Sequence, residues 1–188
     1  MQIVTSAMFF SSLHYAIVSS SFYWNINLKP KQVQCLEAIY FGRDTIGVLP
    51  TGYGKSIIFH LLPGLLLDKI NSHAVRFSST SIINPVVVVV CPLNLLITDQ
   101  IRRSTEGKVK ATILNVKRSR NSDDDVELAL DSSQTNSLLL KEAKYDIVFT
   151  HPEAVLSCQK GIELFQSAPY QQCVQAIVVD EAHCILEW

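Results

Sequence analysis

Residues 49–56 read Leu-Pro-Thr-Gly-Tyr-Gly-Lys-Ser, and this stretch decides the fold. A short apolar run, 45–49, comes before it, and a second apolar run begins at Ile57. A strand, a glycine-rich turn and a helix in this order form a phosphate-binding loop, because main-chain N–H groups converge at the start of the helix. The sequence therefore predicts a strand over 45–49, a phosphate loop and a helix over 55–70.

Each residue type in this loop has an expected chemical task. The glycines at 52 and 54 let the backbone curl so that its N–H groups point at phosphate oxygens. Lys55 is expected to reach the β- and γ-phosphates as a positive charge, and the Ser56 hydroxyl to ligate Mg²⁺. The alternative is a plain turn before a helix. The residues expected to bind the nucleotide here are Thr51, Gly52, Tyr53, Gly54, Lys55 and Ser56.

A second stretch, 176–183, reads Ala-Ile-Val-Val-Asp-Glu-Ala-His. Its four apolar residues predict a buried strand that carries Asp180 to its end, where the carboxylate can hold the same Mg²⁺ through water. Glu181 is placed to orient and deprotonate an attacking water. An acidic pair at a helix N-terminus is the alternative explanation. Both motifs in this order favour one magnesium–triphosphate site.

The remaining pattern predicts a doubly wound α/β domain. Five consecutive valines, 86–90, indicate a strand buried on both faces and hence parallel. Alternating strands and helices give a mainly parallel sheet with helices on both faces and ligands at the strands' carboxyl ends. Pro63 and Gly64 predict a kink or break. The expected helices cover 31–41, 55–70, 93–103 and 152–157, and the expected strands 45–49, 86–91, 111–116, 145–150 and 176–179.

Two segments depart from this alternation. Residues 117–137 are polar and predict a surface insertion, partly disordered, with a short helix around 124–130. Its basic cluster suits either nucleic acid or a solvated loop. Residues 1–25 form an apolar leader of uncertain structure, and the first 28 residues contain no charged side chain. An extra packing segment or a poorly ordered leader is expected here, with a targeting or membrane segment as the alternative, and no membrane partner is expected.

Composition adds bounds on the class of protein. The net charge is −1, so any nucleic-acid surface must be local. The five cysteines are scattered without a Cys-x-x-Cys pair, which indicates reduced thiols in an intracellular protein and no disulfide framework or zinc site.

Several segments together resemble the first RecA-like domain of a RecQ-type DEAH-box helicase of superfamily two. The resemblance covers roughly residues 26–188. The cysteine and tryptophan that follow Asp-Glu-Ala-His, and the Pro-Leu-x-x-Leu-x-x-Asp-Gln run, narrow it to RecQ among helicase branches. The segments that carry the resemblance are 28–32, 49–56, 89–101, 150–153 and 180–188.

The resemblance implies a RecA-like P-loop NTPase fold, ATP and Mg²⁺ as cofactors, and DNA as partner, both single-stranded and at duplex junctions. It implies 3′-to-5′ unwinding in repair, recombination and replication, in the nucleus. The catalytic residues would be Lys55, Asp180, Glu181 and His183, with Ser56 and Asp180 on the metal.

The resemblance also assigns residues to the base and to DNA. Gln32 would read adenine and Lys29 would pack on it, although a solvated first-turn residue is the alternative for Gln32. His183 would couple the nucleotide and DNA sites, or serve as a structural histidine. The residues that would contact DNA are Asn94, Thr150 and Trp188.

The sequence ends at Trp188, before the rest of the first domain and the second RecA-like domain that the family uses. We therefore expect the chain alone to bind Mg·ATP weakly, to hydrolyse it slowly and not to unwind duplex DNA. A nucleotide-binding module without motor activity is the alternative. An RNA-directed relative is another, because Asp-Glu-Ala-His also occurs among RNA helicases.

Overall fold

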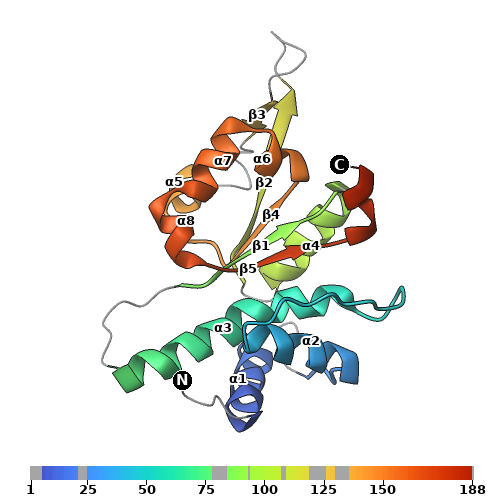
Figure 1. Cartoon of the computed structure of the whole chain (residues 1–188), viewed down its shortest axis with the longest axis vertical. Helices are drawn as coiled ribbons and strands as arrows, with labels where there is room; N and C mark the ends of the chain where they lie inside the picture. The colour runs from blue at the N-terminus through green and yellow to red at the C-terminus, as the bar shows by residue number, and fades with distance from the viewer. Residues whose placement is uncertain are drawn as a thin grey trace. The chain divides into compact units, whose positions relative to one another are not determined.

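The computed structural model describes residues 6–20, 25–77, 84–92, 94–106, 109–118, 126–129 and 136–187 (Figure 1). The chain divides into two compact units. The first, here the helical unit, comprises Met1–Ile83 with Glu106–Val109; the second, the sheet unit, comprises Asn84–Thr105 with Lys110–Trp188.

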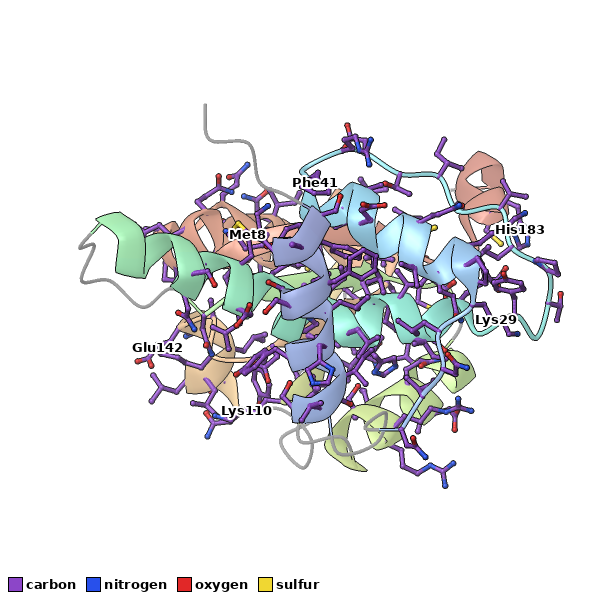
Figure 2. All side chains as sticks on the ribbon, turned by 90° about the horizontal axis from the view of Figure 1, so that it is seen from below. Met8, Lys29, Phe41, Lys110, Glu142 and His183 are labelled. Carbon is purple, nitrogen blue, oxygen red and sulfur yellow. The ribbon has the colours of Figure 1, made fainter. Side chains whose placement is uncertain are left out.

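The helical unit contains α1 (Ser6–Ser19), α2 (Pro30–Tyr40) and α3 (Lys55–Phe77). Helix α1 crosses α3 in both views (Figures 1 and 2). Its apolar side chains Phe9, Leu13 and Ala16 are buried. Gly64 lets the helices approach, because a Cβ there would lie 3.2 Å from the Cα of Ala16. Most of the expected leader is thus a helix packed on α3. Among the described residues no helix is long and apolar enough to span a membrane.

Polar contacts also tie the three helices together. The Ser12 hydroxyl donates to a carboxylate oxygen of Asp68 at 2.7 Å and lies 3.3 Å from the Tyr40 hydroxyl. The Lys69 ammonium donates to the Tyr40 carbonyl oxygen and lies 5.1 Å from the centre of the Tyr40 ring. Burial lowers the pKa of Lys69. These contacts join α1, α2 and α3 at one point.

Helix α3 is longer than predicted and does not break at Pro63. A proline removes one helical hydrogen bond and normally disturbs the preceding turn. Leu61, Leu62 and Leu65 beside it are almost fully buried. Tertiary packing of these residues stabilises the helix more than the local sequence disfavours it. Of the predicted kink or break, the break was therefore wrong, and the kink stays a prediction.

The predicted strand over 45–49 was also wrong. Residues 43–50 have no regular secondary structure, and the side chains of Ile46 and Val48 are 92% and 82% exposed. A strand needs a neighbour for its main-chain hydrogen bonds, and the sheet contains no strand from this segment. A short apolar run by itself does not establish such a neighbour.

The sheet unit is built on a five-stranded sheet of order β3-β2-β4-β1-β5. Four strands are parallel: β1 (Val86–Val90), β2 (Ala111–Arg118), β4 (Ile147–Thr150) and β5 (Val174–Val179). All five valines of β1 are buried, as the uninterrupted apolar run predicted. In the register, Val88 lies opposite Val148 of β4 and Ile177 of β5. The carboxyl ends of these parallel strands therefore share one edge.

Helices cover both faces of this sheet. On one face Val86, Val88 and Val148 form a core with Ala154 and Tyr170. Helix α4 lies on the other side of the strands from α5, α7 and α8 (Figure 1). This arrangement confirms the predicted mainly parallel α/β class. The helices are α4 (Asn94–Glu106), α5 (Ser137–Lys141), α6 (Pro152–Leu156), α7 (Gln159–Gln166) and α8 (Ala168–Cys173), and a short 3₁₀ helix, η1 (Ala182–Glu187), ends the described chain.

The polar segment 117–137 corrects one further prediction. A helix was expected around 124–130, but β3 (Val126–Ala129) is a strand antiparallel to β2, with Arg118 opposite Val126. Pairing with a neighbouring strand overrode the local preference. The rest of the expected insertion, 119–125 and 130–135, lies outside the described residues.

Candidate nucleotide-binding site

The phosphate loop has the backbone conformation that its glycines predicted. Gly52 and Gly54 have φ angles of +74° and +87°, which only glycine adopts without strain. The Tyr53 N–H donates to the Pro50 carbonyl at 3.1 Å, and the Ile57 N–H donates to the Gly54 carbonyl at 3.2 Å. These two bonds turn the loop directly into the first turn of α3.

Gly54 is required for space as well as for conformation. A Cβ at this position would lie 2.8 Å from Nε2 of Gln32 and 3.0 Å from Cδ1 of Ile57. Any larger residue would have to push the Gln32 amide away from the loop. The sequence pattern therefore reflects a packing contact between the loop and α2.

The start of α3 provides groups that suit an anion with a hard cation. Lys55 and Ser56 are its first two residues, and both are half-buried. The first N–H groups of a helix have no partner within the helix and lie at the positive end of its dipole. Main-chain N–H groups, an ammonium and a hydroxyl together fit a polyphosphate and Mg²⁺.

Gln32 is held against this loop by three hydrogen bonds. Its Nε2 donates to the carbonyl oxygens of Tyr53 at 2.9 Å and Gly54 at 3.0 Å. Its Oε1 accepts from the Lys29 N–H at 2.7 Å. The side chain is 1% exposed, so it is not a solvated first-turn residue. In this arrangement the amide expected to read adenine holds the loop backbone instead.

Lys29 makes a contact that the sequence did not show. Its ammonium lies 4.4 Å from the centre of the Tyr53 ring, a cation–π contact. Figure 2 labels Lys29 at the N-terminal end of α2. Tyr53 was expected to bind the nucleotide, with no task assigned to its ring. No local pattern could show the ring contact, because it depends on how α2 packs beside the loop.

The acidic pair follows β5 directly, as predicted. The prediction that this strand is buried was wrong, because β5 is an edge strand in which Ile177 is 69% and Val179 38% exposed. The Asp180 N–H donates to the Val90 carbonyl at 2.9 Å, which places Asp180 at the carboxyl end of β1. The Glu181 N–H donates to Oδ1 of Asp180 at 3.0 Å. Glu181 has a φ of +50°, an uncommon conformation for a residue with a side chain. Such strain persists only where the surrounding structure holds it, and it gathers at functional sites.

His183 belongs to the same turn. Its Nδ1 lies 3.3 Å from Oε2 of Glu181, and the Cys184 N–H donates to the Glu181 carbonyl at 2.9 Å. The imidazole is largely exposed. Asp180, Glu181 and His183 therefore lie together in the sheet unit, while the phosphate loop belongs to the helical unit.

The structure describes two of the three residues expected to contact DNA. Thr150 is fully buried at the end of β4, and its hydroxyl lies 3.4 Å from the Leu114 carbonyl and 3.3 Å from the His151 carbonyl. A contact between the Thr150 hydroxyl and DNA stays a prediction. It would require the hydroxyl to give up its hydrogen bonds to the carbonyl oxygens of Leu114 and His151. Asn94 is the first residue of α4. Trp188 lies outside the described residues.

None of the five cysteines forms a disulfide, and Cys91 and Cys158 are buried. Within the ranges that the structure describes, no cluster of His, Cys, Asp or Glu side chains forms a metal site.

The fold and the loop define a P-loop nucleotide-binding domain of the α/β class. Residues 29–188 match the family model described as DEAD/DEAH box helicase, and the chain belongs to this family. Its curated relatives include the probable ATP-dependent DNA helicase RecS of Bacillus subtilis, 31% identical over 89% of this chain and 27% of RecS. The RecQ-like DNA helicase BLM of Xenopus laevis is 28% identical over 85% of this chain and 10% of BLM.

A third relative is the bifunctional 3′-5′ exonuclease and ATP-dependent helicase WRN of Mus musculus, 29% identical over 84% of this chain and 10% of WRN. These matches confirm the resemblance to RecQ-type helicases. The chain spans about a quarter of RecS and a tenth of BLM and WRN. Helix α1 lies before the matched region.

Proposed function

We propose that this chain is the Mg·ATP-binding domain of a RecQ-like 3′-to-5′ DNA helicase. The observation that carries the proposal is the loop from Gly52 to Ser56. Its two left-handed glycines and its direct entry into α3 support a phosphate site, and Gln32 holds that loop from α2. The family match and the names of the relatives support ATP-driven action on DNA.

Each residue has a defined task in this proposal. Lys55 neutralises charge on the β- and γ-phosphates, and the loop N–H groups hold their oxygens. Ser56 and Asp180 would hold Mg²⁺, which supplies positive charge to the phosphates when bound. Glu181 accepts a proton from the attacking water, and its strained backbone and His183 fix the direction of its carboxylate.

DNA is the proposed polymer partner, as single strands and at duplex junctions. Asn94, Thr150 and Trp188 are proposed contacts to its backbone, where hydroxyl and main-chain N–H groups bind phosphate without reading sequence. Unwinding, roles in repair, recombination and replication, and a nuclear location are proposals for the whole protein that carries this domain.

The first experiment is titration of purified chain with Mg·ATP, followed by turnover with and without single-stranded DNA. Lys55→Ala should lose nucleotide binding, whereas Lys31→Ala, an exposed lysine of α2, should keep it. Glu181→Gln should bind nucleotide and lose turnover. Unchanged binding by Lys55→Ala would contradict the site. Binding by the wild-type chain without turnover would identify a nucleotide-binding module without motor activity.

A further inference from the structure

The buried face of α2 has a different partner at each end. Its buried side chains are Gln32, Leu36 and Tyr40, spaced four residues apart on one face of the helix. Gln32, in the first turn, holds the main chain of the phosphate loop. Tyr40, the last residue, contacts α1 and α3. One helix therefore joins the phosphate loop to a junction at its opposite end.

Hydrogen bonds in series form this junction. The Ser12 hydroxyl donates its one hydrogen to Asp68 at 2.7 Å, so the Tyr40 hydroxyl, 3.3 Å away, is the donor to Ser12. The Lys69 ammonium donates to the Tyr40 carbonyl oxygen and lies over its ring. Ser12 is 2% and Tyr40 0% exposed, so a lost partner would leave a buried polar group unpaired. Directional bonds from both α1 and α3 therefore hold this end of α2.

Aromatic packing from α1 adds to the junction. The Phe9 ring lies 5.5 Å from that of Tyr40 and 6.5 Å from that of Phe41, the residue after α2. Figure 2 labels Phe41 beside α1 and Lys29 at the opposite end of α2. Helix α1 therefore packs against the end of α2 that lies away from the phosphate loop.

A shift at one end of α2 moves the other end. Gln32 and Tyr40 lie about 12 Å apart along the helix axis, and the hydrogen bonds of a helix make so short an element rigid. The amide of Gln32 donates to the carbonyl oxygens of Tyr53 and Gly54 at 2.9 and 3.0 Å. Such bonds weaken steeply when their atoms move out of line. A tilt of α2 at Tyr40 would therefore disturb the loop that is proposed to hold phosphate.

We propose that Ser12 and Tyr40 are positioning residues for the phosphate loop, and that α1 sets the affinity for polyphosphate ligands through α2. This rests on the proposed function and deepens it, because the site is the same loop. The hydrogen bond between Tyr40 and Ser12 keeps α2 where Gln32 can hold the loop. Helix α1 lies before the residues that match the family model, so this support is not part of the matched region.

The test measures binding of inorganic tripolyphosphate and of Mg·ATP to the full chain by calorimetry. Ser12→Ala and Tyr40→Phe each remove the hydrogen bond between α1 and α2. Each should weaken both ligands about two- to tenfold, the range that corresponds to one hydrogen bond. Ser11→Ala and Tyr15→Phe make the same changes at exposed positions of α1 and should bind both ligands like the wild type.

A second comparison separates positioning from a general loss of structure. Affinities are measured where urea unfolding shows each variant to be fully folded, and Tyr40→Phe decides the question if Ser12→Ala does not fold. Gln32→Ala should itself weaken tripolyphosphate binding. Adding Ser12→Ala or Tyr40→Phe to it should cause no further loss, because the route to the loop is already broken.

Three results would overturn the proposal. The first is wild-type affinity in the folded Ser12→Ala and Tyr40→Phe variants. The second is a loss for Mg·ATP without a loss for tripolyphosphate, because the effect would then concern the base and not the loop. The third is a full additional loss in the double variants with Gln32→Ala.

The outcomes also separate this proposal from the proposed function. Loss of tripolyphosphate binding in Lys55→Ala, with wild-type affinity in Ser12→Ala and Tyr40→Phe, keeps the phosphate site and rejects the role of α1. A wild-type chain that binds neither Mg·ATP nor tripolyphosphate rejects both.

Discussion

The imidazole Nδ1 of His183 lies 3.3 Å from a carboxylate oxygen of Glu181. In the same turn, Glu181 has a backbone φ of +50°, and its N–H donates a hydrogen bond to Oδ1 of Asp180. An exposed pair of this kind adds only about 0–1 kcal/mol to stability. We therefore expect its main effect to be on the direction of the carboxylate of the proposed general base.

His183→Ala should slow ATP turnover on the order of tenfold, as expected when a group that orients a reacting residue is lost. Glu181→Gln should cost roughly 10²- to 10⁴-fold, the usual contribution of a general base. Both variants should bind Mg·ATP like the wild type and unfold at the same denaturant concentration. Single-turnover kinetics and urea unfolding measure the two effects. A His183→Ala variant with normal turnover would show that the contact has no role in positioning.

Helix α1 should contribute strongly to stability although it lies before the family match. Phe9 is fully buried, with its ring 5.5 Å from that of Tyr40, whereas the neighbouring Phe10 is 55% exposed. Phe9→Ala should lower the free energy of unfolding by about 3–5 kcal/mol, as for other buried phenylalanines. Phe10→Ala is the matched control and should cost well under half as much. Equal, small losses in urea unfolding would mean that α1 is not part of the folded unit.

Gly161 should tolerate no side chain. A Cβ there would lie 1.9 Å from the Ala154 carbonyl oxygen, so α7 and α6 would have to separate. Gly161→Ala should lower the free energy of unfolding by about 1–3 kcal/mol, the usual cost of overpacking. We expect a value at the upper end of this range, because the atoms that a Cβ would meet belong to the main chain of Ala154. Gly47→Ala, whose Cβ would meet only the Cys35 sulfur at 3.5 Å, is the control. Thermal unfolding distinguishes them, and similar melting temperatures would contradict the contact.

The carboxyl group of Asp146 should make stability depend on pH. Burial raises the pKa of Asp146, although its Oδ2 accepts a 2.8 Å hydrogen bond from the Lys110 N–H. A raised pKa means that the folded state holds the proton more tightly. The resulting stability is fully present below the unfolded-state pKa and is lost as the pH rises through the folded-state value.

Asp146→Asn keeps a carbonyl acceptor and removes the charge. The variant should therefore lose less stability than the wild type between about pH 4 and pH 7, the range above the ordinary aspartate pKa. Asp44→Asn, at an exposed position, is the control. Urea unfolding at the two pH values measures the difference. A variant with the same pH dependence as the wild type would refute the assignment.

Local patterns predicted most elements of the sheet unit. The valine run gave a buried parallel strand, and the apolar run before Asp180 ends where the acidic pair begins. The predictions were wrong where the structure of a segment depends on a strand that is distant in the sequence. Ile46 and Val48 have strand-forming side chains but no neighbouring strand, and residues 126–129 pair with β2 although their sequence suggested a helix. Main-chain hydrogen bonding between strands is a tertiary property, so a local reading cannot supply it.

The sequence by itself determined the chemistry of this protein: glycines that curl a backbone, a lysine and serine at a helix start, and a carboxylate pair after a strand. These are local features, because each depends on a few consecutive residues. The tertiary structure decided how those residues are used. It directed the amide of Gln32 to the loop carbonyls and set Lys29 over the Tyr53 ring, since both contacts require α2 to pack beside a loop that lies apart from it in the chain.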